Sequence, residues 1–278
     1  MTAVAIMQLV EQGKVDLDAT IQTYLPDFPI KKEGSITVRQ LLQHTAGIPE
    51  YASNSERENM KHYAALSDAV AIFKDRDLTN IPGEAFHYTS YGYVVLGRVI
   101  EQVSGEEYGA YMKKRIWDVV GMPNTGIERA ADPVASHAAL YHITEKGKIS
   151  EPKRTDLSDR VPGGGIYSCL DDLLKFGNAV MDGTLLRPGT VQQMWKDPGV
   201  KMTGNGYGLG WYLYGENPNY GPVYGHNGSQ TGSTTYLMLL PEQRTAVVVL
   251  SNTSGAMQTV TNLTIALFDT AAAIRSER

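Results

Sequence analysis

Four short β-rich segments near the C-terminal end constrain the fold more than any other feature of the chain. They cover residues 207–214, 223–228, 233–240 and 245–251. The breaks between them are too short to hold a crossover helix, and those at residues 217–221 and 241–244 are turn-like. Neighbouring strands joined by such short connections run antiparallel. The sequence therefore predicts an antiparallel sheet.

Helices are predicted to flank this sheet. Residues 256–274 carry apolar side chains at three- to four-residue spacing, which is typical of an amphipathic helix. Residues 91–104 show the same pattern, and Gly105 follows where a helix commonly ends. A sheet capped by a C-terminal helix, with helices inserted earlier in the chain, predicts an α+β layered architecture.

The length of 278 residues fits one large domain. We expect a single domain over residues 1–278, in which a mostly helical lobe at roughly 35–200 lies against an α/β part. The α/β part is expected to be formed by residues 1–30 and 201–278.

Charge and cysteine content exclude several classes of function. The chain has 25 basic and 30 acidic residues and no basic run, which argues against a nucleic-acid partner. No apolar stretch reaches about 18 residues, so no transmembrane segment is predicted. The single cysteine, Cys169, rules out an internal disulfide and a cysteine-based metal site. The six histidines show no metal-ligand spacing, and we predict no metal and no cofactor.

Tyr88 is a candidate for proton transfer. In PGEAFHYTSYGY, residues 82–93, a Pro-Gly turn is followed by a helix that starts close to Ser90. Tyr88 therefore falls on a loop, where its phenol is free to point into a cleft. Such a tyrosine moves protons when a nearby cation lowers its pKa. The same pattern also fits a tyrosine that only packs at a helix N-terminus.

A second candidate segment is the glycine-rich stretch YGHNGSQTG, residues 224–232. Its glycines allow a ligand to approach the backbone closely. His226 adds a titratable group, and the N–H of Ser229 is placed to donate to an anion. A glycine-rich strand with an edge histidine is the alternative. For His44, in LLQHTAG, we expect a buried and hydrogen-bonded structural role.

Six blocks taken together resemble the β-lactamase-related serine hydrolases, which include class C β-lactamases, DD-peptidases, D-aminopeptidases and family VIII esterases. The blocks are MTAVAIMQLVEQGKVDLD, LLQHTAGIPEY, PGEAFHYTSYGYVVLGRVIEQVSG, VPGGGIYSCLDDLLKFG, YGLGW and GHNGSQTGSTTYLMLLPEQRTAVVVLSN. The resemblance runs from residue 1 to about residue 270. It implies a β-lactamase/transpeptidase-like fold and hydrolysis of an ester, a D-amino-acid peptide or a β-lactam through an acyl-serine.

Two family motifs match residues of this chain. The motif Tyr-x-Asn matches Tyr88 to Ser90, which implies that Tyr88 relays a proton and that Ser90 stands where an Asn binds the substrate amide. The motif Lys-Thr-Gly or His-x-Gly matches His226, Asn227 and Gly228, which implies a catalytic role for His226 and a place in substrate binding for Asn227, Gly228 and the following Ser229. The N–H of the next residue, Ser229, is then half of the oxyanion hole. A histidine in place of the lysine favours an esterase or peptidase over a dedicated β-lactamase.

The remaining family motif, Ser-x-x-Lys, supplies the nucleophile and lies immediately before the block that resembles residues 2–14. Only Ser150 to Lys153 has this spacing here, in a polar stretch, and we interpret it as a coincidence. Residues 1–12 are also apolar almost throughout, as in a buried helix that lacks its lead-in. We expect a sequence truncated before its nucleophile, and therefore inactive as it stands. The alternative is a non-catalytic binding protein of the same fold.

The resemblance leans towards a periplasmic or secreted protein, because an export signal would lie in the missing segment. The partner is expected to be a small-molecule or peptide substrate. The oligomeric state is left open.

Overall fold

A five-stranded antiparallel sheet forms one side of the molecule in this computed structural model, which describes residues 1–131, 137–200, 204–218 and 221–276. Its strands follow the order β5-β6-β7-β8-β9. They are β5 (Gly206–Tyr207), β6 (Tyr212–Asn217), β7 (Gly221–Gln230), β8 (Ser233–Leu240) and β9 (Thr245–Ser251). All neighbouring strands are antiparallel, as the short connections predicted.

The predicted strand at residues 207–214 is wrong in one respect, because the structure divides it into β5 and β6. Gly210 has a φ of +81° in the intervening turn, a conformation that favours glycine. A Cβ on the neighbouring Gly208 would also lie 2.1 Å from the carbonyl oxygen of Met194. These two glycines let the chain reverse tightly between the two strands.

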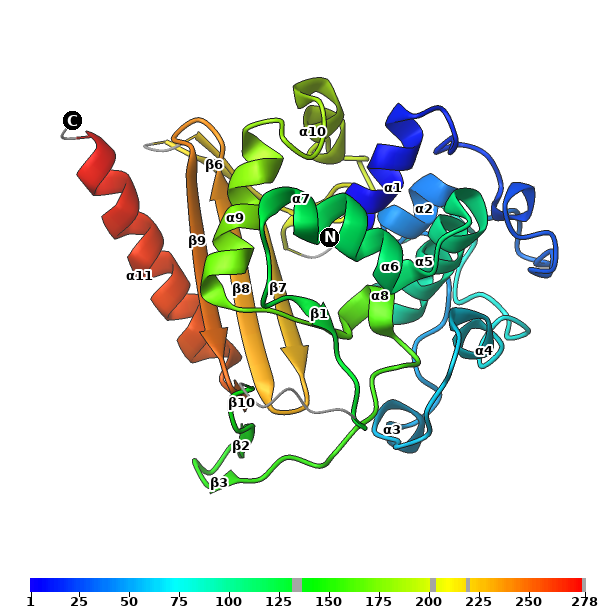
Figure 1. The fold of residues 1–278 in the computed structure, drawn as a ribbon, viewed down its shortest axis with the longest axis horizontal. Coiled ribbons are helices and arrows are strands. Elements are labelled where there is room, and N and C mark those ends of the chain that lie inside the picture. Colours follow the sequence, from blue (N-terminus) through cyan, green and yellow to red (C-terminus); the bar gives the residue numbers. More distant parts are fainter. Residues whose placement is uncertain (132–136, 201–203, 219–220, 277–278) are drawn as a thin grey trace.

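The two faces of the sheet have different coverings (Figure 1). Helix α11 (Met257–Ser276) lies on one face, over an apolar cluster that includes Tyr236 and Val249. Helix α9 (Leu170–Met181) lies on the other, where Leu239 belongs to the main core of the protein. Side chains alternate between faces along each strand, so the strand register decides which residues of β7 face the helical part.

The helical part is built around two buried helices, α1 (Thr2–Glu11) and α5 (Ser90–Ser104), which pack against each other. Helix α5 starts one residue before its predicted range. The short α2 (Val38–Leu42) and α8 (Val161–Gly164) also pack on α5. The main core therefore extends from α1 to the inner face of the sheet.

Shorter elements complete the chain. The other helices are α3 (Asn54–Arg57), α4 (Leu66–Val70), α6 (Tyr108–Met112), α7 (Asp118–Val120) and α10 (Pro188–Met194), with a 3-10 turn at Ile21–Thr23 and a π-helical stretch at Lys113–Trp117. Strand β1 (Gly126–Ile127) pairs with β4 (Ile166–Tyr167), and β2 (Tyr141–Ile143) lies between β3 (Ile149–Ser150) and β10 (Thr253–Ser254). Among the residues described, no helix combines the length and the apolar character needed to cross a membrane.

Candidate active site

Tyr88 lies on the loop that leads into α5. Thr89 caps this helix, since its hydroxyl accepts a hydrogen bond from the N–H of Tyr91 at 3.2 Å. The N–H of Ser90 donates to the Glu50 carboxylate at 3.0 Å. These two hydrogen bonds fix the backbone directly after Tyr88. The residue itself is 38% exposed.

His226 lies in the middle of β7, and both of its ring nitrogens have partners. Nδ1 is 2.5 Å from the carbonyl oxygen of Asn227, and Nε2 is 2.9 Å from the hydroxyl of Tyr207. A carbonyl only accepts hydrogen bonds, so the proton is assigned to Nδ1, and the Tyr207 hydroxyl donates to Nε2. His226 therefore has the tautomer of a neutral imidazole.

The pKa of His226 agrees with a neutral ring. Burial lowers the pKa to about 4, although the hydrogen bond to Asn227 acts in the opposite direction. The amino group of Met1, when charged, lowers it further. At pH 7 His226 therefore carries no positive charge.

The structure brings Tyr88 and His226 together. Their ring centroids are 6.1 Å apart, at an interplanar angle of 46°. Tyr207 lies beside both rings, with centroids 6.5 Å from Tyr88 and 5.8 Å from His226. A phenol from the helical part and an imidazole from the sheet thus lie near each other, and we use the groove as a name for the surroundings of Tyr88, His226 and Tyr207.

The edge of β7 opens where the groove lies. Strand β6 pairs with β7 only up to Gly225, and no other strand within the described ranges pairs with residues 226–230 on that side. Gln230 pairs with Ser233 across a two-residue turn, and the residues that close such a turn form a hydrogen-bonded pair. Counting back in steps of two, the backbone N–H and C=O groups of Gly228 and His226 also bond to β8. Asn227 and Ser229 therefore direct their N–H and C=O groups towards the open edge.

Because side chains alternate between the two faces of the sheet along β7, the predicted substrate-binding residues of this strand do not all point to the same face. Gly228 lies on the same face as His226, opposite Thr235, whose hydroxyl would be 2.6 Å from an added Cβ. The side chains of Asn227 and Ser229 lie on the other face, where the Asn227 amide is 3.9 Å from the sulfur of Met257. At the groove Asn227 and Ser229 therefore present only their backbone N–H and C=O groups. Ser90, the remaining predicted substrate-binding residue, is the first residue of α5, after the loop that carries Tyr88.

The surroundings of Tyr88 raise its pKa. Crowding of the phenol is the main cause, although the residue as a whole keeps 38% of its surface exposed, and Tyr212, Glu50 and Tyr51 act in the same direction. The phenol is therefore protonated at neutral pH and donates a hydrogen bond or a proton. To accept a proton from a nucleophile it needs a nearby cation, because a cation favours the phenolate.

Two residues at the groove had been given no catalytic role from the sequence. Tyr207 belongs to the block YGLGW, but its contact with His226 depends on the turn between β5 and β6, which the sequence did not reveal. His44 was predicted to be buried and hydrogen-bonded, and both features are present. Its ring also lies against Tyr88, with centroids 4.1 Å apart. That contact joins segments 44 residues apart, beyond the reach of local patterns.

No group of three or more metal-ligating side chains occurs in the part of the chain that the structure describes. Ser150 and Lys153, the one pair with Ser-x-x-Lys spacing, lie in and after β3, away from the head of a helix. The side chain of Lys153 is 64% exposed and approaches Glu58 at 3.5 Å. Neither residue has the setting of a helix-borne nucleophile.

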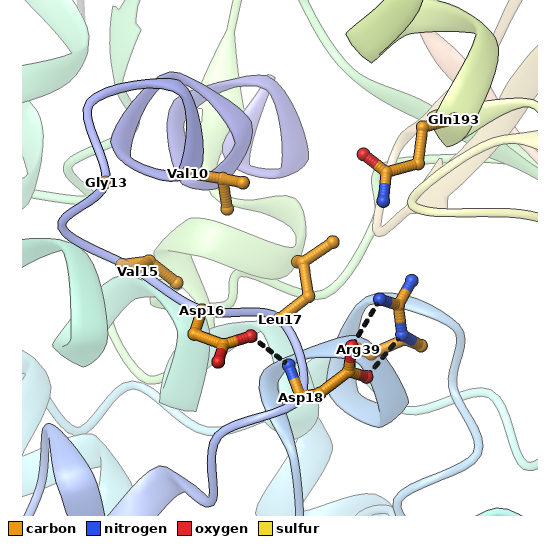
Figure 2. Close-up of a pocket in the computed structure, with 8 residues that line it drawn as sticks. All are labelled: Val10, Gly13, Val15, Asp16, Leu17, Asp18, Arg39 and Gln193. Atoms are coloured by element: carbon orange, nitrogen blue, oxygen red, sulfur yellow. Dashed lines mark hydrogen bonds and ion pairs between the residues drawn. The ribbon is translucent and has the colours of Figure 1, made fainter.

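A hollow of about 390 Å³ lies at the C-terminal end of α1 (Figure 2). Arg39 lines it and donates two hydrogen bonds to the Asp18 carboxylate, at 2.6 and 2.7 Å, and the N–H of Asp18 donates to the Asp16 carboxylate. Arg39 and Asp18 neutralise each other at an exposed surface, where such pairs contribute little energy. The hollow contains no feature that suggests chemistry.

Comparison with known proteins identifies the family of the chain. The family model described as Beta-lactamase matches residues 1–272. The chain belongs to the β-lactamase family. This family match and the fold confirm the predicted resemblance.

Two curated relatives and one solved structure illustrate the relationship. The putative penicillin-binding protein PbpX of Bacillus subtilis is 32% identical over 254 residues, which cover 88% of this chain and 61% of PbpX. The human mitochondrial serine beta-lactamase-like protein LACTB is 26% identical, over 87% of this chain and 61% of LACTB. A penicillin-binding protein from Bacillus halodurans superposes with a TM-score of 0.81 at 27% identity, covering 96% of this chain and 82% of that structure. The β-lactamase-family chain thus spans about three-fifths of the length of these curated relatives.

Proposed function

We propose that the groove belongs to a serine hydrolase that cleaves an ester, a D-amino-acid peptide or a β-lactam through an acyl-serine. The observation that carries this proposal is the meeting of Tyr88 with His226 beside the open edge of β7. Acyl transfer needs a proton relay and donors for a developing oxyanion. The phenol of Tyr88 is a candidate for the proton relay, and the N–H of Ser229 is a candidate donor to the oxyanion.

Each residue then has a separate task. Tyr88 passes the proton between nucleophile and leaving group, and the Ser229 N–H stabilises the negative charge on the carbonyl oxygen. Ser90 offers a short hydroxyl to the substrate amide. Neutral His226 holds the Tyr207 hydroxyl and brings no positive charge to the groove, which favours an ester or peptide over a β-lactam that carries a carboxylate.

We place the nucleophile in a Ser-x-x-Lys segment that directly precedes α1, outside residues 1–278. Three features support this proposal. The charge of the Met1 amino group, at the start of α1, acts on the pKa of His226. Among the described residues that shift the pKa of Tyr88 there is no cation, and Lys153 is exposed and paired with Glu58. A serine and a lysine in the turn before Thr2 would lie on the side of α1 whose amino group acts on His226, the partner of Tyr88 in the groove.

The test compares two proteins: residues 1–278, and the same chain extended through the codons that precede Met1 in the gene. Hydrolysis of p-nitrophenyl acetate is followed for both. We expect turnover by the extended chain only. Equal turnover by both proteins would show that the nucleophile lies within residues 1–278, and absence of turnover together with an upstream Ser-x-x-Lys would contradict the hydrolase proposal.

A second candidate function is binding without turnover. The raised pKa of Tyr88 favours it for residues 1–278, because a phenol that stays protonated does not activate a nucleophile. An in-frame stop codon directly upstream of Met1 would support this alternative. Binding of a D-amino-acid peptide without its cleavage, measured by calorimetry and mass spectrometry, would then be the expected result.

A further inference from the structure

We propose that His44 is the positioning residue for Tyr88, and that it holds the phenol in the groove through contacts on three sides. This inference rests on the proposed function, in which Tyr88 relays the proton. His44 touches neither the substrate nor the reacting atoms in this proposal. It acts through the segment 87–89.

His44 accepts hydrogen bonds from the residue before Tyr88 and from the residue after it. The N–H of His87, the residue before Tyr88, donates to the His44 carbonyl at 2.7 Å. The N–H of Thr89, the residue after it, donates to Nδ1 of the His44 ring at 3.3 Å. The same ring lies against the phenol of Tyr88, with centroids 4.1 Å apart at 35°. One residue thus fixes the backbone on both sides of Tyr88 and the face of its ring.

The backbone of His44 is unusual in a way that serves this contact. His44 has a φ of +54°, a left-handed conformation that non-glycine residues rarely adopt. It follows α2 and its C-cap residue Gln43, at a position where glycine is the common residue. A helix that only had to end would not need a histidine here. The left-handed turn lets both the carbonyl and the ring of His44 face the segment that carries Tyr88.

Packing alone does not explain why residue 44 has a polar imidazole ring. His44 is 2% exposed, and its ring stacks on Tyr93 with centroids 4.9 Å apart. Because Nδ1 accepts a hydrogen bond, the proton is assigned to Nε2, which is buried without a partner among the residues described. A buried polar atom without a partner is costly, so packing alone would favour an apolar ring. The bond from Thr89 to Nδ1 gives a reason for the imidazole.

The contact has a consequence for the whole helical side of the groove. Thr89 is the N-cap of α5, so the bond from its N–H to His44 ties the start of α5 to the end of α2. Tyr88 therefore has one orientation relative to Ser90 and to His226. Orientation of this kind raises the rate of the chemical step and has little effect on substrate binding.

Substitutions separate the contributions of His44. His44→Asn keeps an acceptor near Nδ1 and tolerates a left-handed backbone, whereas His44→Ala removes both the acceptor and the ring. In the extended chain we expect His44→Ala to lower kcat about 100-fold with little change in KM, and His44→Asn to retain more activity than His44→Ala. His142→Ala, which removes a histidine bonded to Ser254 in the three-stranded sheet, is the matched control and should be unaffected. Unchanged kcat in folded His44→Ala would overturn the proposal.

A second readout needs no enzymatic turnover and uses residues 1–278. Tyrosine labelled with ¹³C at the carbon that bears the hydroxyl gives one NMR signal per ring, and the Tyr88 signal is the one lost in Tyr88→Phe. In the unmodified protein we expect a single Tyr88 signal that does not titrate near the ordinary pKa of 10.0. In His44→Asn and His44→Ala it should shift, broaden and titrate closer to that value. An identical signal in all three proteins would overturn the positioning role, even if the extended chain proved to be inactive.

Discussion

The two walls of the groove are built in different ways. The sheet wall, residues 226–229 of β7, takes its geometry from the backbone register with β8, which extends over seven consecutive residue pairs. The helical wall, the loop that carries Tyr88, depends on a few side-chain contacts from distant segments, among them Glu50 and His44. Strand register is shared among many hydrogen bonds, whereas a loop held by single contacts is sensitive to single substitutions. We therefore expect the helical wall to be the more vulnerable one.

Removal of the Tyr88 hydroxyl tests the helical wall and should have the largest effect. Tyr88→Phe in the extended chain keeps the ring and its contact with His44 but loses the proton relay. Loss of a positioned proton donor and acceptor costs about 10²- to 10⁴-fold in rate. Tyr141→Phe, a change at a partly exposed tyrosine of β2, is the control. A Tyr88→Phe rate equal to that of the control would remove Tyr88 from the mechanism.

A change to the backbone of Ser229 tests the sheet wall. Ser229→Pro removes the N–H at an open strand edge, where proline is tolerated, and Ser229→Ala keeps it. Loss of one oxyanion donor costs about 10²- to 10³-fold in kcat, so the proline variant should lose activity and the alanine variant should retain it. Equal rates for the two folded variants would show that this N–H does not serve the oxyanion.

The acid sensitivity of the fold tests the buried state of His226. Its pKa is lowered in the folded protein to about 4, against an ordinary value of 6.5. The unfolded chain then binds more protons between these values, so the free energy of unfolding should fall as the pH drops from 6.5 towards 4. The effect should be on the order of 1 to 3 kcal/mol, since one pKa unit corresponds to about 1.4 kcal/mol.

Urea unfolding of residues 1–278 at pH 7 and pH 5 measures this dependence. His226→Asn, which does not titrate in this range, should reduce the difference between the two pH values. If the variant and the unmodified protein show the same difference, His226 is not the group responsible.

Arg39 lies outside both walls and should have the smallest effect. Arg39→Ala breaks the two bonds to Asp18 at the hollow of Figure 2. Exposed ion pairs contribute about 0 to 1 kcal/mol, so thermal unfolding should change slightly and ester hydrolysis by the extended chain should not change. A large loss of activity would mean that the two ends of α1 are coupled.

The sheet wall was also the easier one to predict. Short turns and β-rich segments predicted antiparallel pairing, and the period of two along β7 already implies that Asn227 and His226 have side chains on opposite faces. The helical wall depends on contacts between distant residues, such as those of His44 with the segment 87–89. No local pattern encodes these contacts. The residues of the groove could be named from family motifs, but their arrangement required the fold.

The most direct test of the account is covalent labelling with a fluorophosphonate, read by intact-mass and peptide mass spectrometry. In the extended chain we expect one adduct, on the serine of a Ser-x-x-Lys segment directly before α1, and its rate of formation should fall in Tyr88→Phe. Residues 1–278 alone should remain unlabelled under the same conditions. A stoichiometric adduct on residues 1–278, or a labelled serine remote from Tyr88 and His226, would contradict the assignment of this groove.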